Sequence, residues 1–285
     1  MHYFGFATTP AFAIAVNTPG DNELYASLVS APGGFTEGSY IFVEKVLRGW
    51  STHAPPLVLD VGGNFAAISI LSAVLGARVH AVEGNPATAE YFRHNVILNC
   101  VATRVDLTQS LVSDKDETVS LDTSTSPFSG AVTITKGVGA GPSIAARSLD
   151  SIFSRVRERA AILKMDIEGY ETQALRGARR LLDAFPPYFV VYEMNPSYIG
   201  RAAAIESITT LQAAGYTLYL LGTQAFIDVA IHEAGSTAFA AWRQRPIPVS
   251  PEAFLDSGPP LSFDLVGVHR DACAAAHAAG SSVCA

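Results

Sequence analysis

The chain has 285 residues, of which 49% are hydrophobic and only 16% are charged. This length favours one large domain or two small ones, and the composition is typical of a folded chain rather than a disordered one. The net charge of -7 argues against nucleic acid as a partner, because a protein that binds a phosphate backbone relies on clustered lysine and arginine.

The apolar runs are too short to cross a membrane. The run at residues 68–75 falls far short of the ~20 residues that a spanning helix needs. Residues 1–16 include an apolar stretch with no basic segment before it, so we expect no secretory signal and a cytoplasmic protein. We expect Cys100, Cys273 and Cys284 to be reduced, with a pair between the last two as the alternative in an oxidising compartment.

From residue 57 onward, short apolar runs alternate with helix-like stretches. In chain order, the pattern predicts a strand at 57–61, a helix at 65–75, a strand at 78–82, a helix at 86–98, a strand at 104–107, a helix at 149–159, a strand at 161–165, a helix at 170–184, a strand at 188–192, a helix at 202–214 and strands at 217–221 and 263–268. Strands that alternate with helices imply a largely parallel sheet covered on both faces, because parallel neighbours need a long crossover. The predicted fold class is therefore α/β.

We divide the chain into three parts: a lead-in at residues 1–50, which is a candidate cap over the site, an α/β domain at 51–271 and a flexible tail at 272–285. Within the domain, a polar stretch rich in Ser, Thr and Gly contains alternating runs at 118–121 and 131–135 that are typical of a small hairpin or an ordered excursion.

The turn after the first predicted strand is the first candidate site. It reads Asp60-Val61-Gly62-Gly63-Asn64. Glycine there lets the backbone approach a ligand closely, and the helix that follows offers free N–H groups at its start. Because ligands of open parallel sheets bind at the carboxyl ends of the strands, we expect a ligand at this turn.

Glu83 ends the second predicted strand, 21 residues after Gly62. An acid at this place can accept hydrogen bonds from both ribose hydroxyls of a nucleoside, as in dinucleotide sites. The turn lacks the GxGxxG pattern of those sites, and Asp60 ahead of the glycines would repel a pyrophosphate but suits the ammonium of an amino acid. The combination favours S-adenosylmethionine over NAD.

Two more carboxylates follow the strand predicted at 161–165. Asp166 and Glu168 stand at the mouth of the next helix. An acid there can hold the amino group of a cofactor, position a substrate hydroxyl or accept its proton. The histidines have no metal-ligand spacing with one another or with the cysteines, so we predict no metal site.

Each of these residues also has a structural interpretation. Asp60 and Asn64 are then helix caps and turn residues. Glu83 is a solvated strand end, and Asp166 is a carboxylate that the dipole of the next helix favours.

Four segments resemble the FkbM-type methyltransferases: LVLDVGGN at 57–64, HAVEGNP at 80–86, ARSLDSI at 146–152 and ILKMDIEGYETQALRGA at 162–178. Phe92–Asn95 and Leu98-Asn99 extend the second segment, and the resemblance covers residues 35–268. It implies the class I methyltransferase fold, a Rossmann-like, seven-stranded, mostly parallel sheet with helices on both faces. It also implies S-adenosylmethionine as the cofactor and methyl transfer, most often to a hydroxyl oxygen of a small molecule or saccharide.

The resemblance implies a set of cofactor-binding residues at the strand ends: Asp60, Gly62, Asn64, Glu83, Gln109, Ser110 and Asp166. In that set, Asp60, Gly62 and Asn64 line the methionine end and Glu83 holds the ribose. Gln109 and Ser110, with Ser113, match the stretch that borders the adenine. The candidate catalytic residues are Asp166, Glu168 and Glu193.

Three positions depart from the family pattern. Gly63 stands where alanine is common, Ala66 where the later glycine of DVGANxG stands, and Gly84 where a proline commonly follows the acid. The methyl group of Ala66 narrows the space beside the turn. Ala66 and Gly84 leave one alternative, a non-catalytic nucleoside-binding module with a degenerate methyltransferase fold. A second alternative is an NAD-dependent oxidoreductase on a similar sheet, against which the missing GxGxxG pattern argues.

Overall fold

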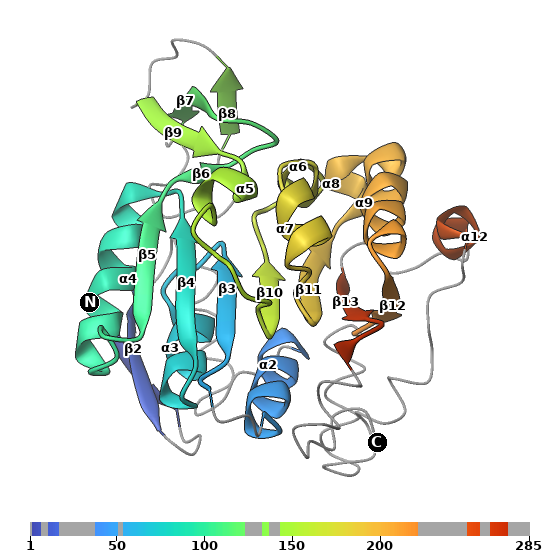
Figure 1. Cartoon of the computed structure of the whole chain (residues 1–285). Helices are drawn as coiled ribbons and strands as arrows, with labels where there is room; N and C mark the ends of the chain where they lie inside the picture. The colour runs from blue at the N-terminus through green and yellow to red at the C-terminus, as the bar shows by residue number, and fades with distance from the viewer. Residues whose placement is uncertain are drawn as a thin grey trace.

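The structure is a computed structural model that describes residues 2–6, 11–16, 38–50, 54–122, 133–136, 143–221, 250–256 and 263–272. Its centre is a seven-stranded sheet in the order β12-β13-β11-β10-β3-β4-β5 (Figure 1). The strands are β3 (Leu57–Val61), β4 (Arg78–Glu83), β5 (Val105–Gln109), β10 (Ile162–Met165), β11 (Phe189–Met194), β12 (Tyr216–Leu220) and β13 (Phe263–His269). β13 is antiparallel to its two neighbours and the other pairs are parallel, which confirms the predicted sheet.

Helices cover both faces of this sheet. On one face lie α2 (Gly38–Arg48), α3 (Ala67–Val74) and α4 (Pro86–Leu98), and on the other lie α5 (Leu149–Ile152), α6 (Glu171–Arg176), α7 (Arg179–Ala184), α8 (Pro196–Ile199), α9 (Arg201–Ala213) and α12 (Pro251–Asp256). The side chains of β3 alternate between the two cores, because successive residues of a strand point to opposite faces: Val58 packs with α2 to α4, and Leu59 with the other helices. All of β3 is buried, as expected for a strand covered on both faces.

Two predicted helices differ from the structure. The helix predicted at 149–159 ends at Ile152, because the chain must turn back to enter β10. The helix predicted at 170–184 is divided into α6 and α7 at Gly177, where a Cβ would lie 2.7 Å from the carbonyl oxygen of Ser113. A close approach of this kind comes from a distant segment and leaves no local pattern in the sequence.

A four-stranded sheet lies beyond the carboxyl ends of β4 and β5 (Figure 1). Its order is β6-β9-β7-β8, with β6 (Leu111–Val112), β7 (Glu117–Asp122), β8 (Thr133–Lys136) and β9 (Ser143–Arg147). The antiparallel pair of β7 and β8 confirms the predicted hairpin, of which residues 131 and 132 lie outside the described residues. The strands β6 and β9 were not predicted, and they tie the hairpin to the end of β5.

An antiparallel pair of strands, β1 (His2–Phe6) and β2 (Phe12–Val16), precedes the sheet in the sequence, and β2 packs beside α4 (Figure 1). Two asparagine side chains bind the backbone of β2: Asn95 of α4 binds Ala15, and Asn99, the residue that caps the C-terminus of α4, binds Ala13. Four helical residues advance about 6 Å and two strand residues about 6.6 Å, so the two spacings match. The two carboxamides therefore take the place of a neighbouring strand.

Parts of the remaining predictions lie outside the described residues. Residues 17–37 of the lead-in, most of the tail and both Cys273 and Cys284 belong to this group. Cys100 is an exposed free cysteine. Within the part of the chain that the structure describes, no helix is long and apolar enough to cross a membrane.

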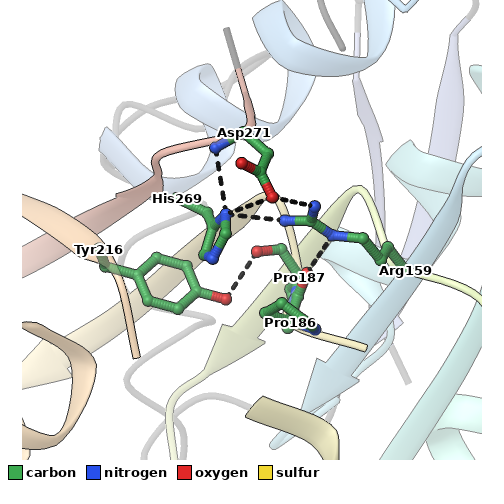
Figure 2. Close-up of polar contacts among 6 residues, drawn as sticks. All are labelled: Arg159, Pro186, Pro187, Tyr216, His269 and Asp271. Carbon is green, nitrogen blue, oxygen red and sulfur yellow. Dashed lines mark hydrogen bonds and ion pairs between the residues drawn. The ribbon is translucent and has the colours of Figure 1, made fainter. Parts of the chain in front are cut away.

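A polar cluster closes the amino edge of the sheet, where the parallel strands begin (Figure 2). The Arg159 guanidinium donates to the carbonyl oxygen of Pro186 at 2.7 Å, pairs with Asp271 at 2.8 Å and lies 2.9 Å from Nδ1 of His269. It also stacks 4.1 Å from the centre of the Tyr188 ring. All three nitrogens of the guanidinium thus have partners inside the fold.

Candidate functional site

The carboxyl ends of β10, β3 and β4 meet at the place where the strand order reverses, which is where open α/β sheets bind ligands. The turn after β3 lies against the end of β10, because Asp166 N donates to Val61 O at 3.0 Å. Gly62 has a φ of +83°, and a Cβ there would lie 1.8 Å from the Asp166 carbonyl oxygen. Glycine is therefore required at this position by the packing of the two strands.

Backbone strain is concentrated at these strand ends. Among the described residues, four non-glycine residues have a positive φ, and three of them lie here: Asn64 (48°), Ala66 (70°) and Glu168 (54°). Such conformations cost free energy and persist where the surrounding structure holds them, most often at functional sites. The turn delays the start of α3 to Ala67, two residues later than predicted.

Asp60 lies beneath the turn and is fully buried. Its Oδ2 accepts a hydrogen bond from Ser69 Oγ at 2.5 Å, whereas Oδ1 has no hydrogen-bond partner among the described residues. Burial raises the pKa of Asp60, and the nearby Lys164 opposes that rise. The structure thus places Asp60 under the candidate ligand surface, so its predicted contact with the methionine end stays a prediction.

Lys164 is a residue that the sequence reasoning missed. It lies directly opposite Asp60 in the pairing of β10 with β3 and is almost fully buried. Its Nζ donates to the carbonyl oxygen of Gly62 at 2.9 Å and lies 3.4 Å from Asp166 Oδ2 and 3.7 Å from Asp60 Oδ1. A charged residue between Leu163 and Met165 in a buried strand was the available signal, because a buried charge needs a partner.

Glu83 joins the turn to the start of α4. Its Oε2 accepts a hydrogen bond from Asn64 N at 2.8 Å, and its Oε1 accepts one from Asn85 N at 2.7 Å. Burial raises the pKa of this carboxyl, and the two backbone donors oppose the rise. Each carboxylate oxygen has acceptor capacity for a second donor, so Glu83 can hold the turn and also bind a ligand hydroxyl.

The predicted adenine stretch divides into exposed and buried residues. Gln109 is exposed at the end of β5 and accepts a hydrogen bond from Arg93 at 2.9 Å. Ser110 is buried and donates to the carbonyl oxygen of Ala145 at 3.0 Å, so it holds the small sheet. Ser113 is also buried, and its hydroxyl lies 3.0 Å from a carboxylate oxygen of Glu117.

Packing accounts for the glycine at position 84. A Cβ on Gly84 would lie 2.4 Å from Cδ2 of Leu111, the first residue of the small sheet. Glycine at this position, which departs from the family pattern, therefore leaves room for the small sheet that follows β5.

The candidate catalytic acids stand on two neighbouring strand tips. Asp166 follows Met165, which pairs with Tyr192, and Glu193 follows Tyr192 in β11. The side chain of Asp166 is 47% exposed, and Glu168 is exposed in the loop after β10. The structure thus brings Asp166 and Glu193 to corresponding positions at the edge of the sheet.

Glu171 is a second residue that the sequence reasoning missed, although it lies in the segment at 162–178 that carries the family resemblance. Its buried Oε1 accepts hydrogen bonds from the backbone N–H groups of Ile167 at 2.9 Å and Gly169 at 3.4 Å. Burial raises its pKa to about 7, and Asp166 contributes to the rise. Glu171 therefore holds the loop that carries Asp166 and Glu168.

Residues 60–218, more than half of the chain, match the family model described as the methyltransferase FkbM domain. The chain belongs to the FkbM methyltransferase family. This result confirms the predicted family and fold, and it makes the protein an S-adenosylmethionine-dependent methyltransferase. It decides against the NAD-dependent alternative. Among the described residues of this FkbM methyltransferase, no cluster of His, Cys, Asp or Glu has the arrangement of a metal site.

Solved structures with a similar fold include three methyltransferases of low sequence identity. A putative O-methyltransferase from Klebsiella pneumoniae is 13% identical, with 87% of this chain and 96% of that chain covered and a TM-score of 0.42. A SAM-dependent methyltransferase from Agrobacterium tumefaciens is 10% identical, with 93% and 69% covered and a TM-score of 0.44. An RNA methyltransferase from Salinibacter ruber, in complex with S-adenosyl-L-homocysteine, is 18% identical, with 54% and 74% covered and a TM-score of 0.32. A search of the curated proteins found no match to the chain.

Proposed function

We propose that this FkbM methyltransferase transfers the methyl group of S-adenosylmethionine to a hydroxyl oxygen of a small molecule or saccharide. The observation that carries the proposal is the position of Asp166 and Glu193 on neighbouring strand tips, beside the strained turn after β3. A hydroxyl acceptor needs a group that takes its proton, and carboxylates at this edge are suited to that task.

The residues of the turn fit the proposed cofactor. Each oxygen of Glu83 accepts one backbone N–H group and has a lone pair for a ribose hydroxyl. Three carboxylates, Asp60, Glu83 and Asp166, stand against one buried cation, Lys164, and their negative balance favours a sulfonium and an ammonium group. We assign the methionine end to Gly62 and Asn64 and the adenine border to Gln109, with Ser110 supporting it from below.

The chemistry of the cofactor leaves the protein a limited task. When bound, S-adenosylmethionine supplies a methyl group that its positive sulfur has already activated. The turn and the loop after β10 then orient the acceptor oxygen in line with the bond to that methyl group. With the cofactor bound, Asp166, Glu168 or Glu193 would accept the hydroxyl proton as the oxygen–carbon bond forms and the methyl–sulfur bond breaks, with S-adenosylhomocysteine as the leaving group. Lys164, 3.4 Å from Asp166 Oδ2, keeps that carboxylate in place.

Calorimetry and a labelled-methyl assay test the proposal. We expect the protein to bind S-adenosylhomocysteine but not NAD, and to transfer label from S-adenosylmethionine to hydroxyl acceptors in a panel that also contains amines and carboxylates. Label found on nitrogen or on a carboxylate contradicts the oxygen acceptor. Binding without transfer to any acceptor favours the non-catalytic nucleoside-binding module instead.

A further inference from the structure

Asn95 of α4 joins two segments that are far apart in the sequence. The side chain is fully buried, and its Oδ1 accepts a hydrogen bond from Ala15 N at 2.7 Å. Its Nδ2 donates to Ala15 O and to Phe65 O, both at 2.9 Å. Both N–H groups of the carboxamide are therefore used, one for strand β2 and one for the turn after β3.

The second of these bonds reaches the most strained part of the turn. Phe65 O belongs to the peptide between Phe65 and Ala66, and the residues on either side of Phe65, Asn64 and Ala66, have φ values of 48° and 70°. Glu83 holds the same turn from its other side by accepting Asn64 N. A strained turn needs such anchors, because without them it relaxes toward commoner backbone conformations.

We propose that Asn95 is a positioning residue for the cofactor. Its carboxamide holds the peptide between Phe65 and the left-handed Ala66 and ties it to β2, so the position of the N-terminal strand sets the shape of the cofactor turn. The inference rests on the proposed binding of S-adenosylmethionine at that turn. It adds a residue with no ligand contact of its own to the determinants of cofactor affinity.

Asn99 provides a matched control one helical turn away. Its Oδ1 accepts Ala13 N at 2.8 Å and its Nδ2 donates to Ala13 O at 2.6 Å, as Asn95 does with Ala15. Its remaining N–H group donates to Asn95 O at 2.8 Å, at the C-terminal end of α4, rather than to the turn. Asn95→Ala and Asn99→Ala therefore both lose a contact with β2, and Asn95→Ala also loses the hydrogen bond to the turn.

The test compares these two variants in the full chain. We expect both to unfold at a lower temperature than the wild type, but Asn95→Ala alone to bind S-adenosylhomocysteine about tenfold more weakly by calorimetry, as for one lost buried hydrogen bond. Without ligand, the amide hydrogens of Ala66 and Ile70, which bond to Gly63 O and Ala66 O, should exchange about tenfold faster in Asn95→Ala and at the wild-type rate in Asn99→Ala.

Other outcomes have equally definite meanings. Equal loss of affinity in both variants, or no loss in either, overturns the proposal and leaves Asn95 with a structural role. A wild type that binds no S-adenosylhomocysteine overturns the proposed function, and the exchange rates then decide on the role of Asn95 separately. If Asn95→Ala does not fold, hydrogen exchange of the wild type tests the proposal. The amides of Ala15 and Ala66 should then open as one unit, with protection factors that agree within about threefold, and a larger difference overturns the proposal.

Discussion

The polar residues differ in their contacts between the amino edge of the seven-stranded sheet, where the parallel strands begin, and its carboxyl edge, where they end. At the amino edge, Arg159, His269 and Asp271 bind one another and the backbone (Figure 2). At the carboxyl edge, Asp60 has a buried oxygen without a hydrogen bond among the described residues, and three non-glycine residues have a positive φ. The polar groups of the amino edge thus stabilise the fold, whereas the carboxyl edge retains backbone strain and hydrogen-bond acceptors that a ligand can use, as a binding site does.

The largest effect is expected at the carboxyl edge, from Lys164→Met. The variant leaves Asp60 buried without the cation that faces it, and breaking a buried ion pair costs about 3–5 kcal/mol of unfolding free energy. Chemical denaturation at neutral pH measures the loss. Adding Asp60→Asn should restore most of the stability, because no buried charge then remains. A double variant as unstable as Lys164→Met would instead assign the loss to the bond with Gly62 O.

Glu171→Gln should change how the stability of the carboxyl edge depends on pH. The pKa of Glu171 is raised from 4.5 to about 7, so the folded state holds this proton more tightly than the unfolded state. Its contribution is fully present below about pH 4.5 and is lost as the pH rises through about 7, by about 3 kcal/mol. Denaturation of both proteins at about pH 5 and pH 8 should show the wild type gaining on the variant in acid. A constant difference would contradict the pKa.

Glu83→Gln should weaken binding of S-adenosylhomocysteine. A hydrogen bond to a charged group contributes ~1.5–3 kcal/mol, which corresponds to a roughly 10- to 100-fold loss of affinity in calorimetry. Glutamine keeps one acceptor for the backbone, so the turn should survive. The control is Glu158→Gln, which removes an exposed acid that pairs with Arg78 at the amino edge, and its affinity should equal that of the wild type. Equal affinities in all three proteins would exclude Glu83 from the site.

The smallest effect is expected at the amino edge, from His269→Gln, and its sign is opposite to that of Glu171. Burial and the Arg159 guanidinium lower the pKa of His269, Arg270 adds to the effect and Asp271 opposes it. The folded state therefore disfavours the proton, so this stability is present above the unfolded pKa near 6.5 and is lost as the pH falls. Between about pH 7 and pH 5, the thermal unfolding temperature should fall more steeply for the wild type than for the variant. Parallel curves would show that the pKa of His269 does not differ between the folded and unfolded states.

Local patterns were sufficient to predict the large sheet and the residues at its carboxyl edge. Apolar runs such as Leu57–Val61 and the turn after them carry their signal within a few residues, so the α/β order followed directly. The broken helix at Gly177 and the strand β9 could not be predicted, because both depend on contacts with segments more than twenty residues away.

The supporting residues of the site were harder to predict than its surface. Lys164, Glu171 and Asn95 act by holding backbone groups, and the partners of Lys164 and Asn95 lie on other elements. Ser110 was predicted as an adenine neighbour, but its hydroxyl binds the small sheet. Sequence motifs mark such positions without saying whether the side chain faces a ligand or the protein.

The binding of β2 by Asn95 and Asn99 also has a consequence for self-association. An uncovered strand edge is a template on which other chains can add strands, the first step toward aggregates. Along β2, the carboxamides of Asn95 and Asn99 already occupy the N–H and C=O groups of Ala15 and Ala13. The two side chains thereby prevent a strand of a second molecule from pairing with that edge, which should reduce aggregation at high protein concentration.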